Sequence, residues 1–126
     1  MKVDKKAAIA RRNQQLGGAV LGLNNSHFAA INLNKNIWWF DIPVGRLGIG
    51  QYEFIHLLLH HTQTDALHHL RVPTLYLRTH QDGLVTRHKD TRKATVSLEL
   101  SADRDAWLQD VRPTGAGVRF AEFLQP

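Results

Sequence analysis

Residues 37–72 constrain the fold of this chain more than any other segment. They read IWWFDIPVGRLGIGQYEFIHLLLHHTQTDALHHLRV and hold two of the three tryptophans and five of the eight histidines. Residues 37–42 are apolar except at Asp41, which is typical of a buried strand. Strand alternation puts Trp38, Phe40 and Ile42 on one face and Ile37, Trp39 and Asp41 on the other. With an aromatic side chain on each face, we predict a central strand that is covered on both sides.

Residues 51–72 fit either one long helix or a hairpin. Leucine favours a helix, but residues 62–65 read Thr-Gln-Thr-Asp, which is a poor helix interior and an ordinary turn. We therefore favour a hairpin, with the helix as the alternative. In the hairpin the inward side chains are Ile55, Leu57, Leu59, Ala66, His68, Leu70 and Val72. The side chains expected in solvent are Tyr52, Phe54, His56, His60, His69 and Arg71.

The remaining segments give the fold class. Residues 3–16 are good helix formers and Gly17-Gly18 ends them. Residues 28–33 and 37–42 flank an Asn-Lys-Asn turn and predict a hairpin, and residues 94–100 alternate as a strand. Further helices are expected from Thr74, after Ser101 with Trp107, Leu108 and Val111 buried, and over residues 118–124. We predict a single α+β domain over residues 1–126, with a mixed or antiparallel sheet of about five to six strands and helices packed on it.

Charge is concentrated in two short segments. The net charge is +5 and the isoelectric point is near 10. Residues 1–12 carry Lys2, Lys5, Lys6, Arg11 and Arg12 against Asp4, a local charge of +4. Residues 87–93 carry Arg87, Lys89, Arg92 and Lys93 against Asp90, a local charge of +3. The rest of the chain is therefore slightly acidic, so an anionic partner is expected at these two segments.

The same segments predict a sequence-nonspecific binding module for nucleic acid or another acidic partner. Basic side chains contact phosphates regardless of base sequence. The expected phosphate-binding residues are Arg71, Arg87, Lys89, Arg92 and Lys93. An exposed Trp38 or Tyr52 could stack on a base. The plain alternative is a solvated loop and a solubilising terminus.

Asp41 and Glu53 suggest a second class, a metal-dependent hydrolase. They are the acids within the apolar middle of the chain, at the end of one expected strand and the start of the next. With the order of helix, three strands, helix and strand, this pattern resembles the PD-(D/E)xK nuclease superfamily. The resemblance implies Mg²⁺ held by the two carboxylates. That family has a lysine two residues after the second acid, where this chain has Ile55, and His56 could replace it as the basic group. The alternative is that Asp41 caps a turn and Glu53 is solvent-exposed.

The histidine pairs suggest a metal site, because neutral imidazole is the commonest nitrogen ligand of transition metals. In the hairpin, His60 and His69 are diagonal neighbours on one face, with His56 beyond. The alternative is a polar stripe that faces solvent. The glycine-rich residues 45–50 lack the ending of a phosphate-binding P-loop and are expected to form a turn.

A third class is an apolar ligand pocket or a self-associating protein, suggested by the many Trp, Phe and Leu residues in a short chain. Cysteine is absent, so disulfides and thiolate metal sites are excluded. The N-terminus has no apolar core typical of a secretory signal, and no apolar run approaches the roughly 18 residues of a membrane helix. We expect a soluble, cytoplasmic protein without a membrane partner.

Overall fold

The computed structural model describes residues 3–112 and 117–126. Its elements, in chain order, are α1 (Lys5–Leu16), β1 (Ser26–Ala30), β2 (Ile37–Pro43), β3 (Phe54–His61), β4 (Ala66–Pro73), α2 (Thr74–Thr79), β5 (Val85–Arg87) and β6 (Thr95–Ser101). Short 3-10 turns occupy Val44–Leu47, Gln81–Gly83, Arg104–Ala106 and Ala121–Phe123. The α+β class is confirmed. No helix in the described part of the chain is long and apolar enough to span a membrane.

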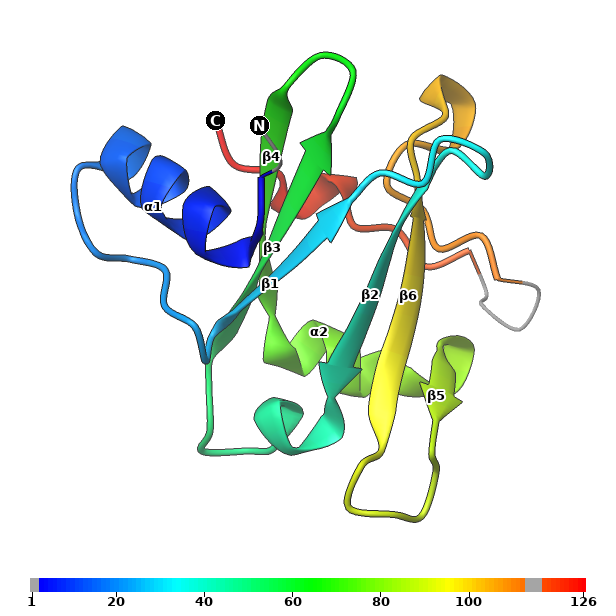
Figure 1. The fold of residues 1–126 in the computed structure, drawn as a ribbon. Helices are drawn as coiled ribbons and strands as arrows, with labels where there is room; N and C mark the ends of the chain where they lie inside the picture. Colours follow the sequence, from blue (N-terminus) through cyan, green and yellow to red (C-terminus); the bar gives the residue numbers. More distant parts are fainter. Residues whose placement is uncertain (1–2, 113–116) are drawn as a thin grey trace.

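The prediction of one sheet of five to six strands is wrong, because the strands form two sheets of three (Figure 1). Sheet A has the order β1-β3-β4, with β1 parallel and β4 antiparallel to β3. Sheet B has the order β2-β6-β5 and is antiparallel. The predicted hairpin between residues 28–33 and 37–42 is reduced to one bridge between Asn32 and Ile37. Beyond this bridge β1 and β2 diverge, so each strand joins a different sheet.

Residues 51–72 form the predicted hairpin. β3 and β4 pair from Phe54 with Pro73 to His61 with Ala66. Asp65 takes a left-handed φ of 57° in the turn, a conformation that aspartate tolerates better than most residues. The helix alternative is excluded by this pairing.

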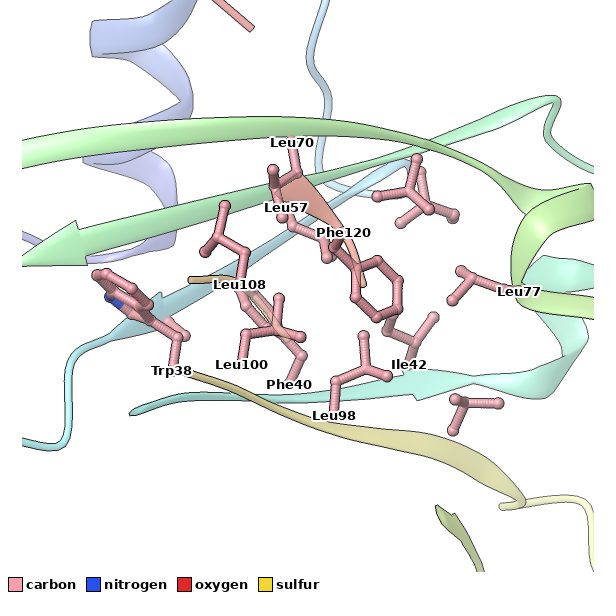
Figure 2. Close-up of a cluster of buried hydrophobic side chains, with 14 of the residues drawn as sticks. Trp38, Phe40, Ile42, Leu57, Leu70, Leu77, Leu98, Leu100, Leu108 and Phe120 are labelled. Atoms are coloured by element: carbon pink, nitrogen blue, oxygen red, sulfur yellow. The ribbon is translucent and has the colours of Figure 1, made fainter. Parts of the chain in front are cut away.

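The main core lies between the two sheets (Figure 2). Trp38, Phe40 and Ile42 of β2 face the inward leucines of β3 and β4, and Phe120 fills the space between them. Trp38 is fully buried, and its Nε1–H donates to the carbonyl oxygen of His60 at 3.1 Å. The hydrogen bond satisfies the indole's polar atom, so the ring can be buried without an unpaired donor.

A smaller core joins α1 to the outer face of sheet A. The helix begins at the cap Asp4, whose side chain accepts from the amide of Ala7, and ends at Gly17, where φ is 77°. Ala8 of the helix packs on Leu58 of β3, with Phe28 and Leu67 beside them. The prediction that His56, His60 and His69 face solvent is therefore wrong, since all three are at least 95% buried beneath or beside this helix.

The prediction for β2 is half right. Trp38 is buried as expected, but Trp39 is 46% exposed. β2 lies at the edge of sheet B, and its Trp39 face is only partly covered, because Ile37 is buried there while Trp39 is exposed; the prediction of a central strand covered on both faces is therefore wrong. Asp41, on the same face as Trp39, marks that face as the solvent side.

The predicted helices near the C-terminus are also wrong. After Ser101 the chain makes a 3-10 turn and then returns along β6, with Asp110 bridging Leu100. Leu108 is buried as expected, but Trp107 is half-buried and Val111 is 45% exposed. Residues 118–124 contain only the turn Ala121–Phe123, because Val118 and Phe120 bond to the backbone of residues 108–110 instead. The sequence Arg112-Pro113-Thr114-Gly115 also predicts a break between these two helices, and residues 113–115 lie outside the described residues.

Candidate nucleic-acid interface

The outer face of sheet B presents a tryptophan in a fixed orientation. Nε1–H of Trp39 donates to Oγ of Ser97 at 2.9 Å, and Nη2 of Arg112 donates to the same oxygen at 3.0 Å. Ser97 itself is fully buried on the neighbouring strand β6. Both lone pairs of the hydroxyl are used, so the indole is held in place while nearly half of it remains in solvent.

Two hollows adjoin this indole. One, of about 270 Å³, lies where β1 and β2 diverge and is lined by Lys5, His27, Phe28, Trp39, Phe40 and Asp41. The other, of about 290 Å³, is lined by Asn32, Lys35, Ile37, Trp39, Glu99 and Arg112. Trp39 is the residue common to both, with the first hollow toward Asp41 and the second toward Ile37.

Arg87 extends from β5 across the sheet toward Trp39. Its guanidinium carbon is 5.5 Å from the centre of the indole ring, within the range of a cation–π contact. Nη1 of Arg87 is 3.3 Å from Oδ2 of Asp41, which is a long single contact between half-exposed groups. Such a pair contributes little stability, so Arg87 can exchange this partner for another anion at little cost.

Lys5 lines the first hollow, and Arg46 lies beside its lining residue His27. Nη1 of Arg46 donates to Nε2 of His27 at 3.2 Å. Burial, together with the charges of Arg46 and Lys5, lowers the pKa of His27 to about 4. Burial and the charge of Arg46 also lower the pKa of Lys5. Burial is the larger cause of both shifts, and the positive charge of Arg46 adds to it in each case.

The second hollow has its own cations. Arg112 contacts Glu99, and Lys35 lies 3.8 Å from the same carboxylate. Burial lowers the pKa of Arg112, and the nearby charge of Arg87 lowers it further. We call this surface the Trp39 face, defined by Trp39, Lys5, Lys35, Asp41, Arg46, Arg87, Glu99 and Arg112. It has five cationic side chains and two carboxylates, an excess of three positive charges.

The predicted phosphate-binding residues do not form one surface. Arg87 belongs to the Trp39 face, and Lys89, Arg92 and Lys93 are exposed in the loop that follows it. Lys89 borders a separate hollow together with Asp82 and Asp90. Arg71 lies on the outer face of sheet A, with its guanidinium carbon 3.7 Å from the ring centre of Phe54.

Much of the basic N-terminal charge has partners within the protein. Arg11 pairs with Asp65 at 2.9 Å, and Nζ of Lys5 donates to the carbonyl oxygen of Leu23 at 2.7 Å. Arg12 is buried and donates to His69, Gln15 and the carbonyl oxygen of Pro126. Lys2 lies outside the described residues. The N-terminal segment is therefore largely a structural element, and Lys5 is its contribution to the Trp39 face.

The predicted catalytic residues lie in three different places. Asp41 borders the hollow between β1 and β2, whereas Glu53 borders a larger hollow of about 490 Å³ on the other sheet, formed with residues at the start of α2. His56 is buried beneath α1. One oxygen of Asp41, Oδ1, is buried without a hydrogen-bond partner among the described residues. The three side chains do not share a hollow, and their catalytic role stays a prediction.

The predicted metal ligands His60 and His69 are diagonal neighbours on sheet A, as expected. Nε2 of His60 lies 2.8 Å from Oδ1 of Asp65, and Nδ1 of His69 accepts from Nε of Arg12 at 3.0 Å. Over residues 3–112 and 117–126, no three or more His, Asp or Glu side chains are grouped to hold a metal ion. Both histidines thus have protein partners, and metal binding by them stays a prediction.

The expectation that Trp38 is exposed is wrong. Trp38 is fully buried, and Trp39 is the exposed ring. The signal was present in the strand pattern, since Trp39 shares a face with Asp41 and Trp38 shares a face with Phe40 and Ile42. No local sequence pattern predicts that Arg112, Lys35 and Arg46 lie near Trp39, because they come from three separate segments of the chain.

No protein-family model matches the chain, and neither the search of curated proteins nor the search of solved structures returned a match. The order of helix, three strands, helix and strand, on which the resemblance to the PD-(D/E)xK nuclease superfamily rested, is wrong, because four strands lie between α1 and α2 in the described residues.

Proposed function

We propose that this protein is a small binding module for polyanions, with nucleic acid as the ligand and an acidic protein as the alternative occupant of the same face. The observation that supports the proposal most is the cationic rim around an exposed, fixed indole on sheet B. Positive neighbours contribute, after burial, to the lowered pKa values of Lys5, His27 and Arg112, which is consistent with a locally positive rim. A cytoplasmic location is part of this proposal.

Binding through this face is sequence-nonspecific. Its cations are positioned to meet phosphates, and contacts to phosphates carry no base information. The exposed residues Lys89, Arg92 and Lys93 continue the positive field along the loop after Arg87. They therefore add long-range attraction that is strongest at low ionic strength.

The test is fluorescence anisotropy with a labelled oligonucleotide of about 12 nucleotides, within the range that small modules cover. With about four phosphate contacts, raising salt from about 50 to about 200 mM should weaken binding about 50-fold. Replacing Arg87 by Gln should weaken binding several-fold and reduce the slope of the logarithmic salt dependence by about 0.7.

Arg71→Gln is the matched control. Arg71 is also an exposed arginine over an aromatic ring, but it lies on the opposite sheet. We expect this variant to bind as the wild type does. Equal losses for Arg71→Gln and Arg87→Gln would point to net charge alone, and binding that is insensitive to salt would rule out the proposal.

Self-association is a second candidate, favoured by one observation. Ile49 is 88% exposed and Leu75 is 63% exposed, and both line the hollow of about 490 Å³ that also holds Glu53. Exposed aliphatic side chains around a hollow are typical of contact surfaces. Sedimentation at two protein concentrations tests this candidate, with Ile49→Asp expected to reduce any dimer and Leu33→Asp, at another exposed leucine, as the control.

A further inference from the structure

The exposed indole of Trp39 defines which kind of nucleic acid the face accepts. Among the three tryptophans, Trp38 is fully buried, Trp107 is half-buried against it, and Trp39 is 46% exposed. A large apolar ring in solvent is unfavourable unless something covers it. The hydrogen bond to Ser97 fixes the ring, so its exposed surface is the same from one molecule to the next.

We propose that Trp39 is a stacking platform for a nucleobase, and that the ligand of the Trp39 face is a single-stranded nucleic acid. This inference rests on the proposed polyanion-binding function. A flat ring that is held in place pays little entropy when a base stacks on it, and base–aromatic stacking does not depend on base identity. In a duplex each base is already stacked between its neighbours, so it offers no free face to the indole.

The surroundings of Trp39 match a base with a phosphate on each side. The hollow on one side presents Lys5, next to Arg46, and the hollow on the other presents Lys35 and Arg112. A strand whose base covers Trp39 would place its two flanking phosphates over these depressions. The two hollows are separated by the indole, as the geometry of one stacked nucleotide requires.

Arg87 must move off the indole ring, or share its surface with the base, before a base can stack on Trp39. It lies over the indole at 5.5 Å and is held by the 3.3 Å contact to Asp41. A phosphate offers more oxygen acceptors than Oδ2 of Asp41 and can draw the guanidinium away from the ring. Arg87 then becomes a phosphate contact at the moment when the ring is covered by the base.

The experiment separates the contribution of the bases to binding from that of the phosphates, and it uses the wild-type protein throughout. Wild-type binding is measured to a single-stranded oligonucleotide, to the same strand with abasic sites, to the matching duplex and to inorganic polyphosphate. The abasic strand keeps its phosphates and loses its bases. We expect the normal strand to bind about 5- to 150-fold more tightly than the abasic strand, which is the range for one stacked base.

Two variants test whether the affinity difference between the normal and abasic strands arises at Trp39. Trp39→Leu should lower the affinity for the normal strand by the same factor and leave the affinity for the abasic strand unchanged. Trp39→Phe, which keeps a ring but lacks the indole N–H, should lose less. Ligand-induced quenching of tryptophan fluorescence should be largely lost in Trp39→Phe, because Trp38 is fully buried and Trp107 is half-buried against it.

The outcomes distinguish the two proposals. Equal affinity of the wild type for normal and abasic strands, or unchanged binding by Trp39→Leu, would overturn the stacking platform while leaving the polyanion-binding module in place. A wild-type preference for the duplex would also overturn it. No binding to any of the four ligands would overturn both.

Discussion

His69 donates a hydrogen bond to His56, with 2.8 Å between Nε2 of His69 and Nδ1 of His56. The direction follows from Arg12, whose Nε donates to Nδ1 of His69 at 3.0 Å. Because arginine only donates, Nδ1 of His69 must be the unprotonated nitrogen and Nε2 must carry the hydrogen. Both imidazoles are therefore neutral, and protonating either would set two N–H groups against each other beneath α1.

Acid should destabilise the fold. Burial, then the charges of His56, Arg12 and Arg71, lowers the pKa of His69 from 6.5 to about 4. Burial also lowers the pKa of His56, and His27 falls to about 4. The unfolded chain thus takes up protons first, so stability is complete above about pH 6.5 and is lost as pH falls toward 4. We expect the free energy of unfolding in urea to drop by a few kcal/mol across this interval.

His69→Gln tests the origin of that drop. The variant removes one of the titrating groups, so its free energy of unfolding should be lower at neutral pH and should fall less steeply between pH 6.5 and 4. His88→Asn, in an exposed loop, should follow the wild type. A wild-type stability that stays level over this interval would contradict the neutral pair.

The neighbouring arginines of α1 should differ in their contribution to stability. Arg12 is 7% exposed and makes three hydrogen bonds, whereas Arg11 forms a surface pair with Asp65. Replacing Arg12 by Gln leaves buried acceptors unpaired and should cost about 1–3 kcal/mol in urea unfolding. Arg11→Gln should cost at most about 1 kcal/mol. Equal costs for the two variants would mean that the Arg12 contacts are not formed.

The elements that could be predicted from sequence are those with a local pattern. Strict alternation in residues 95–100 and the turn at residues 62–65 determine β6 and the β3–β4 hairpin by short-range sterics. The division into two sheets has no such signal. It depends on where β1 and β2 part after the Asn32–Ile37 bridge, and that is decided by packing of the inward side chains across the core.

The histidine face shows why burial was harder to predict than strand register. Alternation correctly put His56, His60 and His69 on one face of sheet A. Their polarity suggested solvent, but α1 covers them and Arg12 and Asp65 satisfy their ring nitrogens. A segment more than 40 residues away in sequence supplies that cover, so no local pattern reveals it. The Trp39 face is similar, since its cations come from distant segments.

Trp38 and Trp39 are adjacent in sequence and should respond oppositely to substitution. Trp38 is fully buried in the core of Figure 2, so Trp38→Ala should cost about 3–5 kcal/mol of folding free energy. Trp39→Ala removes a ring that is nearly half in solvent and should cost about 1 kcal/mol. Urea unfolding measures both changes. A larger loss of folding free energy for Trp39→Ala than for Trp38→Ala would mean that β2 is shifted by one residue, which exchanges its two faces.

Ser97→Ala should loosen Trp39 without removing it. Ser97 is a positioning residue, because its Oγ accepts from both the indole and Arg112. Without that acceptor, the indole N–H of Trp39 and the guanidinium of Arg112 can donate to water instead. The free energy of unfolding should therefore fall by only about 1 kcal/mol. The indole should become more mobile, which lowers the fluorescence anisotropy of Trp39 in a background where the other tryptophans are phenylalanine. Affinity for a single strand should fall several-fold, while affinity for polyphosphate should fall less, because Arg112 keeps its contact with Glu99.

Ser101→Ala is the matched control for this prediction. Ser101 is another buried serine of β6, and its Oγ accepts from the amide of Asp103 rather than from the Trp39 face. A comparable loss of stability is expected, with no change in the anisotropy of Trp39 or in single-strand affinity. If both serine variants weakened single-strand binding equally, the effect would come from general loosening of sheet B, and the role of Ser97 in holding the indole would be disproved.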